Sequence, residues 1–542
     1  MQPNMRDYDE LRRTFRWPSP ERFNFAVDVV DRWARDPAMV AMRHVGDSGE
    51  RTLTFRHFAE RSDRLANALE ALGLSAGDRV LVMLPRVVEW WEAMLGLEKA
   101  RMVAMPGTTL LTPKDIDYRL EAAEASAVIT DAANADKVDA APRSKGLAAR
   151  IVVGAERAGW QTFETILQVA SPKRTPPPTP ANEPSLLYFT SGTTGYPKMV
   201  LHTHASIGLA HEVTGRFWLD LRPGDLHWNI SDTGWAKAAW SSLFGPWQCG
   251  ATLLVQEGTG KFAAPEILRF LGRYPVTTLC GPPTVYRMLV QEDLSTLRCP
   301  TLRHCVAAGE PLNPEVIATW EKATGLVIRD GYGQTETVIL CGNFPPITVR
   351  PGSMGKPAPG FDLAIIDDEG TRLGPGREGD IAIRVEPVRP LGLFTEYWKN
   401  PEAMAASFRH GWYTTGDRGM TDADGYFWFV GRADDVIISA GYRIGPFEVE
   451  SALIEHPAVA EAAAVASPDP MRGAVVKAFV VLAPGRTGSD ALIAELQDHV
   501  KKVTAPYKYP REIEFVPDLP KTISGKIRRL ELRQREEQRK RA

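Results

Sequence analysis

A loop rich in glycine and hydroxyl residues, TSGTTGYPK, runs from Thr190 to Lys198. It offers many backbone N–H and hydroxyl donors to one anion, since glycine lets the backbone come close and the lysine adds a point charge. These residues at this spacing predict a polyphosphate cradle. The Walker A pattern fails, because Lys198 follows Pro197 and precedes Met199 where that pattern needs Ser or Thr after the lysine. A surface loop is the alternative for this string alone.

Two later strings carry residue types suited to a nucleotide. DGYGQTET, residues 330–337, could stack a base on Tyr332 and place Glu336 near a phosphate-bound Mg²⁺. A polar turn is the alternative. In YTTGDRG, Asp417 directly follows a glycine, and its carboxylate could accept both ribose hydroxyls. Aspartates in that position are commonly turn residues.

The elements expected around these strings alternate between helix and apolar strand. Residues 186–189 predict a buried strand before the glycine-rich loop, and residues 80–84 predict another. Leucines at helical spacing predict a helix that closes at Gly73. Such alternation favours parallel sheets covered on both faces. Ligands bind beyond the carboxyl ends of such strands. We expect two strands to end there, at Gly281-Pro282-Pro283 and at AAGEPL (307–312).

Length and composition narrow the class of protein. The 542 residues should form more than one domain, and 44% hydrophobic with 24% charged residues is ordinary for a globular protein. A net charge of -3 gives no drive towards nucleic acid or an anionic membrane. The five cysteines form no CxxC pair and fit free thiols. The N-terminus lacks an apolar signal segment, and the uncharged run between Lys237 and Glu257 is interpreted as core. We therefore expect no membrane span, no nucleic-acid partner and a cytoplasmic location.

The composition changes after GRADDVIISAGYRIGPFEVE, residues 431–450. The last hundred or so residues predict a compact α/β unit with strands near 475–482 and 513–516, ending in PKTISGKIRR. The charged tail beyond is expected to be a solvated helix, with nucleic-acid binding as the weaker alternative.

Taken together and in this order, these strings resemble the acyl-adenylate-forming superfamily of acyl-CoA synthetases, luciferases and peptide-synthetase adenylation domains. The medium-chain acyl-CoA synthetase group is the most similar. The strings that carry the likeness are ISDTGW, GYRIGPFEVE, HPAV, SPDP, VKAFVVL, TAPYKYPR and LPKTISGK. The resemblance implies an α/β fold: a large N-terminal domain of parallel and mixed sheets with flanking helices over residues 1–433, a hinge at Asp434, and a small mobile α+β domain over residues 434–542.

The resemblance also implies roles for single residues. The residues implied in adenylation are Lys526, Thr335, Glu336 and Lys198, and Glu336 would hold Mg²⁺. The ATP and AMP contacts implied are Thr190, Ser191, Gly192, Thr193, Thr194, Gly195, Lys198, Gly309, Glu310, Pro311, Asp330, Gly331, Tyr332, Gly333, Gln334, Thr335, Asp417, Arg432 and Lys526. The CoA contacts implied are Ala440, Gly441, Tyr442, Arg443, Arg472, Lys501, Tyr509 and Arg511. The acyl-pocket walls implied are Trp235, Gly281, Pro282, Val306 and Gly333.

The activity implied is an AMP-forming ligation of a medium-chain fatty acid to CoA, driven by ATP with Mg²⁺. Acetate-specific relatives carry a tryptophan at the position of Gly333, so the glycine predicts open volume behind the reacting carboxylate. Aryl or branched-chain acids are the alternative substrates. An adenylation domain serving a carrier protein, a luciferase-like oxygenase and a non-catalytic nucleotide-binding protein are further alternatives. The resemblance also allows a homodimer.

Overall fold

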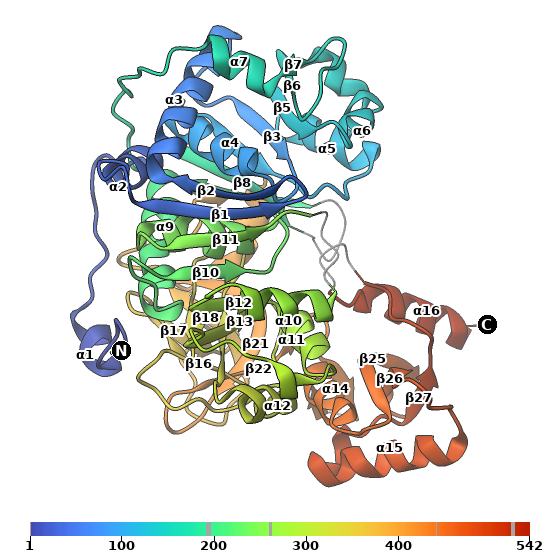
Figure 1. Cartoon of the computed structure of the whole chain (residues 1–542). Coiled ribbons are helices and arrows are strands. Elements are labelled where there is room, and N and C mark those ends of the chain that lie inside the picture. Colours follow the sequence, from blue (N-terminus) through green and yellow to red (C-terminus); the bar gives the residue numbers. More distant parts are fainter. Residues whose placement is uncertain (1, 191–196, 259–262, 441, 522–525, 542) are drawn as a thin grey trace.

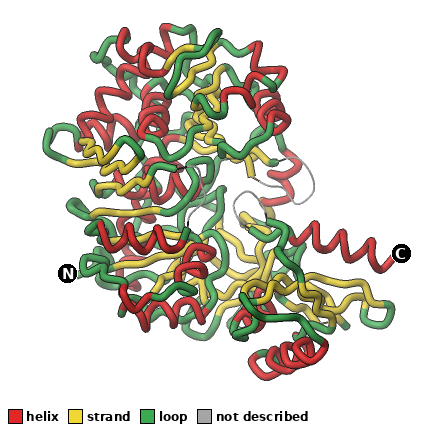
Figure 2. Tube along the Cα trace, turned by 45° about the vertical axis from the view of Figure 1, so that its right-hand side comes forward, coloured by secondary structure: helices red, strands yellow, loops and turns green. Residues whose placement is uncertain are grey.

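The computed structural model describes residues 2–190, 197–258, 263–440, 442–521 and 526–541. Within them, the chain forms a large α/β body and a smaller unit built from the C-terminal hundred residues (Figure 1). Figure 2 shows the strands inside the body and the helices along its outside.

An eight-stranded sheet forms one half of the large body, in the order β19-β9-β8-β4-β3-β5-β6-β7. Its central strands are parallel, whereas β8 and β9 form an antiparallel pair. The described bounds are β3 Arg79–Met83, β4 Val103–Pro106, β5 Ala127–Asp131, β6 Ala149–Val153, β7 Gln161–Thr162, β8 Pro184–Thr190, β9 Lys198–Thr203 and β19 Glu396–Tyr397. The buried strands predicted over 80–84 and 186–189 are confirmed.

A fourteen-stranded sheet runs through the other half of the body. The six strands β1, β11, β10, β12, β13 and β14 are parallel neighbours, and antiparallel strands continue the sheet beyond β14. The described bounds are β1 Val40–Gly46, β2 Gly49–Thr54, β10 Leu226–Asn229, β11 Thr252–Gln256, β12 Thr278–Gly281, β13 His304–Ala308, β14 Ile328–Tyr332, β15 Cys341–Gly342, β16 Ser353–Pro357, β17 Leu363–Ile366, β18 Gly379–Arg384, β20 Phe408–Arg409, β21 Trp412–Thr421 and β22 Phe427–Arg432.

The helices of the body follow the strand pattern that the sequence predicts. Helix α3 begins after the N-cap Thr54, whose side chain accepts from a backbone N–H, and the chain turns out of the helix at Gly73 with a φ of 88°. The helices of the body are α1 Tyr8–Thr14, α2 Asp31–Trp33, α3 Phe55–Ala71, α4 Val88–Lys99, α5 Pro113–Ala122, α6 Ala135–Asp139, α7 Phe163–Val169, α8 Ala236–Ala239, α9 Gly245–Gln248, α10 Ala264–Arg273, α11 Pro283–Leu289, α12 Pro314–Thr324 and α13 Pro401–Ser407.

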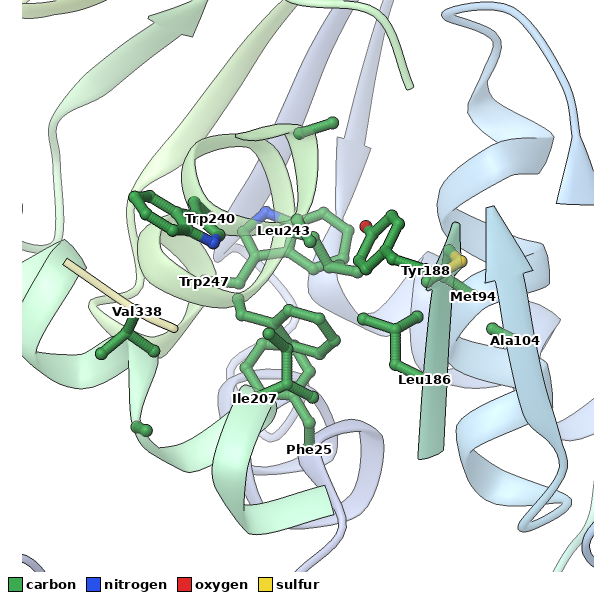
Figure 3. Close-up of a cluster of buried hydrophobic side chains, with 14 of the residues drawn as sticks. Phe25, Met94, Ala104, Leu186, Tyr188, Ile207, Trp240, Leu243, Trp247 and Val338 are labelled. Carbon is green, nitrogen blue, oxygen red and sulfur yellow. The ribbon is translucent and has the colours of Figure 1, made fainter. Parts of the chain in front are cut away.

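The largest core lies between the two sheets. Figure 3 shows Leu186 and Tyr188 of β8 facing Trp240, Leu243 and Trp247 from the segment around α8 and α9. All five side chains are buried. Burying side chains of this size contributes about 1.5–3 kcal/mol each. The core therefore fixes the two sheets relative to each other, and with them the loops at their edges. It also confirms that the uncharged run between Lys237 and Glu257 is core.

The C-terminal unit contains a hairpin, a three-stranded sheet and three helices. Its described elements are β23 Ile437–Ser439, β24 Tyr442–Ile444, α14 Pro446–Ile454, β25 Val459–Asp469, β26 Gly473–Leu482, α15 Asp490–Val503, β27 Glu512–Phe515 and α16 Arg529–Arg541. The strands predicted near 475–482 and 513–516 are confirmed. The charged tail does form a helix, but α16 is not merely solvated, because Leu532 and Glu536 are buried against the sheet. Among the described residues, no helix combines the length and the apolar character needed to span a bilayer.

Candidate active site

A cavity of about 430 Å³ gathers the strings that were predicted to bind a nucleotide. Every predicted ATP contact that the structure describes lines it. These residues are Thr190, Lys198, Gly309, Glu310, Pro311, Asp330, Gly331, Tyr332, Gly333, Gln334, Thr335, Asp417, Arg432 and Lys526, and Glu336 lines it as well. The predicted contacts Ser191, Gly192, Thr193, Thr194 and Gly195 lie outside the described residues.

Strand ends bring these residues to one edge of the body. The parallel neighbours β13 and β14 deliver Gly309 and Gly333 just beyond their carboxyl ends. Gly309 has a φ of 108°, a backbone conformation that favours glycine. In the other sheet, Thr190 ends β8 and pairs with Lys198, the first residue of β9. The glycine-rich string therefore connects two paired strands whose ends both face the cavity.

The carboxylate of Asp417 is held by three neighbours. The hydroxyl of Tyr332 donates to Oδ2 at 2.5 Å, and Nε2 of Gln334 donates to the same oxygen at 2.8 Å. An Nη1 of Arg432 lies 3.3 Å from Oδ1. Burial raises the pKa of Asp417, and the charge of Arg432 opposes that shift. The result is a fixed acceptor-only group at the wall of the cavity, which suits the hydroxyls of a ribose.

Opposite signs of charge meet on the side of the cavity that holds Lys198. The hydroxyl of Tyr397 donates to Oε1 of Glu336 at 2.8 Å, and the Nζ of Lys198 lies 4.6 Å from the centre of the Tyr397 ring. Burial raises the pKa of Glu336, whereas the Tyr397 hydrogen bond and the Lys198 charge lower it. With this arrangement, Glu336 could hold a metal ion that binds a polyphosphate, while Lys198 contacts the same polyphosphate directly.

A magnesium ion would fit this geometry. Mg²⁺ is usually held by one or two carboxylates plus the substrate's own phosphates. Glu336 supplies one such carboxylate at the cavity. Within the part of the chain that the structure describes, no group of three His, Cys, Asp or Glu side chains forms a ready-made metal cluster.

Sequence reasoning missed two residues that support this site. Tyr397 lies on β19, which pairs with β9, so only the folded sheet brings it to Glu336. The Nε2 of His202 lies 2.7 Å from the carbonyl oxygen of Thr335. Since that oxygen only accepts, Nε2 must carry the proton, and burial lowers the pKa of His202 to about 4, so the ring is neutral. No local motif marks either residue.

Two more carboxyl groups at the cavity differ in their electrostatics. Glu310 is partly buried, which opposes ionisation, but the charge and hydrogen bond of Arg287, whose Nη2 lies 2.8 Å from Oε2, outweigh this and lower the pKa of Glu310. Burial raises the pKa of Asp330 to about 8. Asp330 is therefore mostly protonated near neutral pH, while Glu310 is ionised.

Gly333 lines the cavity, and the indole of Trp240 lies against it. A Cβ placed on Gly333 would lie 2.4 Å from Cη2 of Trp240 and 2.7 Å from the carbonyl oxygen of Val338. A side chain at this position would therefore meet the indole, and the open space predicted behind the reacting carboxylate stays a prediction. Of the five predicted acyl-pocket residues, only Gly333 lines the cavity. The other four lie on the strands and helix starts behind it: Gly281 ends β12, Pro282 precedes α11, Val306 is on β13 and Trp235 precedes α8.

The predicted CoA contacts that the structure describes lie on the small unit and do not line the cavity. The exposed ring of Tyr442 stacks on Tyr507 with centroids 4.4 Å apart. The Nζ of Lys501 lies 4.4 Å from the Tyr509 ring centre, and the guanidinium of Arg511 lies 5.0 Å from it. The remaining described contacts are Ala440, whose N–H donates to the carbonyl of Arg472, and the exposed Arg443. Gly441 lies outside the described residues.

The predicted hinge lies in the turn between β22 and β23. The Nε of Arg432 lies 3.7 Å from Oδ1 of Asp434. Lys526 reaches the cavity from the small unit, whereas the CoA contacts of that unit stay outside it. The structure thus shows one relative orientation of the two parts.

Comparison with known proteins identifies relatives over nearly the whole chain. The family model described as AMP-binding enzyme matches residues 28–398, and the AMP-binding enzyme C-terminal domain matches residues 448–526. Acyl-coenzyme A synthetase ACSM3 of Pongo abelii is 52% identical over 98% of this chain and 93% of its own. These matches confirm the resemblance inferred from the motifs.

Solved structures agree with that assignment. An anthranilate CoA ligase in complex with anthranoyl-AMP has a TM-score of 0.89 at 32% identity, covering 97% of this chain and 99% of its own. A benzoate CoA ligase from Burkholderia xenovorans has a TM-score of 0.84 at 31% identity, covering 94% of this chain and all of its own. The predicted fold class, with a large N-terminal part and a smaller C-terminal part, is confirmed.

One expectation is overturned by the same comparison. The Pongo abelii relative is a mitochondrial enzyme by name. This finding contradicts the cytoplasmic location that we expected because the N-terminus lacks an apolar signal segment, and that prediction was wrong. An apolar segment is diagnostic of secretion and carries no information about mitochondrial import.

Proposed function

This chain belongs to the AMP-binding enzyme family, and on that basis we propose that it is an AMP-forming acyl-CoA synthetase acting on medium-chain fatty acids. One observation carries the proposal: Lys526 of the small unit lines the same cavity as Lys198, Glu336 and Asp417 of the large body. Full-length similarity to an acyl-coenzyme A synthetase supports the reaction class.

In the first half-reaction, a carboxylate oxygen of the acid attacks the α-phosphorus of ATP, and pyrophosphate leaves. Two anions must approach each other, so positioning and charge neutralisation dominate the catalysis. Asp417 accepts the ribose hydroxyls and fixes the nucleotide. Lys198 and Lys526 place positive charge on the phosphates. Mg²⁺ held by Glu336 supplies further charge neutralisation when bound.

The loop after β14 contributes position rather than charge. Neutral His202 donates to the Thr335 carbonyl and holds the backbone that carries Thr335 at the cavity wall. Gln334 donates to Asp417, the carboxylate that we propose binds the ribose. The same short loop carries Glu336, which lies beside Lys198 where we propose the phosphates bind. A rigid loop of this kind keeps the α-phosphorus at a fixed distance from the incoming carboxylate.

In the second half-reaction, the CoA thiol attacks the acyl carbonyl of the adenylate and AMP leaves. The described CoA contacts lie outside the cavity in this orientation. We infer that the unit from residue 434 onward turns at Asp434, which removes Lys526 and brings Tyr442 and Arg443 to the site. The basic groups around Tyr509 would then meet the CoA phosphates.

We propose that the acyl chain runs along Gly333, which lines the cavity and has the indole of Trp240 next to it. Medium-chain acids are our proposed substrates. Aromatic acids are the second candidate, because the two similar solved structures are named as ligases of anthranilate and benzoate.

A panel of acids tests the proposal. Pyrophosphate release is measured with ATP, Mg²⁺ and CoA over acetate, straight chains of increasing length, 2-methyl-branched chains and benzoates. A peak at medium straight chains is the expected result. A peak at benzoates keeps the reaction but overturns the proposed substrate, and silence over the whole panel contradicts the function. Size exclusion of the same preparation tests the homodimer that the resemblance allows.

A further inference from the structure

Helix α16 is attached to the small unit by apolar burial and by ion pairs. Leu532 packs with Phe479 and Leu519 in a small core. Glu536 is buried, and its Oε2 lies 2.6 Å from the Nζ of Lys477 on β26. Arg539 lies 2.7 Å from Glu512 of β27. The helix therefore moves with the three-stranded sheet as one body.

One residue of this helix points away from the sheet, to the predicted hinge. Nη1 of Arg533 lies 2.8 Å from Oδ1 of Asp435, and the same nitrogen donates to the carbonyl oxygen of Asp434. The Arg533 side chain is 18% exposed and that of Asp435 is 16% exposed. A half-buried guanidinium bound to two oxygens is more constrained than an ordinary surface ion pair.

The two acceptors lie on the same side of the pivot. The carbonyl oxygen of Asp434 and the whole of Asp435 follow the Cα of Asp434 in the chain, and the planar peptide moves as a unit. A turn about the φ and ψ bonds of Asp434 leaves both contacts of Arg533 in place. From the other side, Arg432 of β22 approaches the Asp434 side chain and pairs with Asp417. The contacts of Arg533 thus lie after Asp434 in the chain, and Arg432 lies before it, which suits Asp434 as the pivot.

Lys526 lies close in sequence to Arg533, which holds the peptide after Asp434, because α16 begins at Arg529. Arg529 itself is anchored to Glu450 of α14, with Nη2 to Oε2 at 2.6 Å. Any looseness between the hinge peptide and α16 would therefore alter where Lys526 enters the cavity. A displacement of about 1 Å at a catalytic group can reduce a rate by about 10²-fold.

We propose that Arg533 is a positioning residue for adenylation: from α16 it holds the peptide that follows Asp434, and this contact sets where the small unit places Lys526. The inference rests on the proposed function, since it assigns Lys526 to the adenylation step. Arg533 does not line the cavity, so it acts only through the position of Lys526.

The test is ATP–pyrophosphate exchange with a medium-chain acid and no CoA. Arg533→Ala should reduce exchange about 10-fold. Arg535→Ala is the matched control, since Arg535 lies on the same helix but pairs with Glu514, away from the hinge. It should stay within about 2-fold of the wild type, as expected for a largely exposed ion pair. Arg533→Lys, which keeps the charge on a more flexible side chain that ends in a different group, should fall between the two.

A double variant separates positioning from loss of stability. If Arg533 acts through Lys526, Arg533→Ala/Lys526→Ala should exchange no more slowly than Lys526→Ala alone. Losses that multiply would overturn the inference, as would wild-type exchange by Arg533→Ala. If Arg533→Ala does not fold, the Arg533→Lys rate decides in the same way. A wild type that shows no acid-dependent exchange overturns the proposed function and this inference with it.

Discussion

The large body and the small unit contribute to the site in different ways. In the body, Asp417 accepts from Tyr332 and Gln334, while Glu336 accepts from Tyr397. These groups are fixed by neighbours within the large body. On the small unit, Lys526 lines the cavity, whereas Tyr442 is 53% exposed on a face that does not. The site residues that the large body contributes all lie within one rigid part. Which residues the small unit contributes depends on its orientation.

This difference indicates a division of labour. Under the proposed mechanism, hydrogen-bonded groups in one rigid core would bind the nucleotide in both half-reactions, because none of them needs to move. Groups on a unit that turns can serve one half-reaction and then withdraw. Substitutions in the body should therefore damage both half-reactions, and substitutions in the small unit should separate them.

The largest expected effect comes from removing Lys526. Lys526→Ala should reduce adenylation by about 10²–10³-fold, since a charge aimed at the transition state is lost. Thioester formation from supplied acyl-adenylate should stay near the wild-type rate. Both are measured with purified protein, the first by pyrophosphate exchange and the second by CoA-thioester formation. Equal loss in the two assays would remove the distinction between body and small unit.

Asp417 tests the large body, where a substitution should damage both half-reactions. Asp417→Asn keeps the shape but removes the charge that faces Arg432 and leaves amide hydrogens opposing the donors of Tyr332 and Gln334. The KM for ATP should rise about 10–100-fold, as expected when charged hydrogen bonds are lost. AMP affinity, measured by calorimetry, should fall in parallel. Unchanged AMP binding would exclude Asp417 from the ribose.

Trp240 tests whether the wall behind Gly333 limits the substrate. Trp240→Leu should open space and shift the preference towards longer acids by about 10-fold in relative kcat/KM, a typical limit for apolar pocket changes. Short acids should lose activity modestly. The measurement is kcat/KM over a straight-chain series. An unchanged length profile would show that the acyl chain runs elsewhere.

The smallest effect concerns stability rather than rate. Burial raises the pKa of Asp330 to about 8, above its unfolded value, so the folded state binds the extra proton. Its contribution is present at low pH and is lost as the pH rises towards 8. Asp330→Asn should therefore gain stability relative to the wild type as the pH rises from about 4 to 8, and melt about 2–4 °C higher near pH 8, a shift typical of 1 kcal/mol in a large domain. A constant difference across pH would contradict this assignment.

The nucleotide half of the site could be predicted from the sequence because its residues are clustered in short strings. Residues 190–198 and 330–337 each carry their chemistry locally, and parallel strands must bring their ends together. Tyr397, His202 and Trp240 could not be found this way. Each reaches the site only through tertiary packing, and a tyrosine, a histidine or a tryptophan in isolation is more often part of a core.

The fold, too, could be predicted where the signal is local and not where it depends on tertiary packing. Alternating apolar strands and helices indicated the parallel sheets, while the docking of α16 escaped prediction because its sequence is almost entirely charged. Leu532 and the buried Glu536–Lys477 pair attach it to the sheet, together with ion pairs such as Arg539–Glu512, and none of these residues stands out in the chain. The neighbour of Gly333 escaped prediction too, since the Trp240 indole reaches this glycine only through the fold.

The most direct test of this account is ATP–pyrophosphate exchange by the wild-type protein without CoA. A bound acyl-adenylate intermediate predicts exchange that requires the medium-chain acid and Mg²⁺ but not the thiol. Exchange that appears only when CoA is added, or no exchange with any acid that supports AMP formation, would contradict the two-step mechanism and the division between body and small unit.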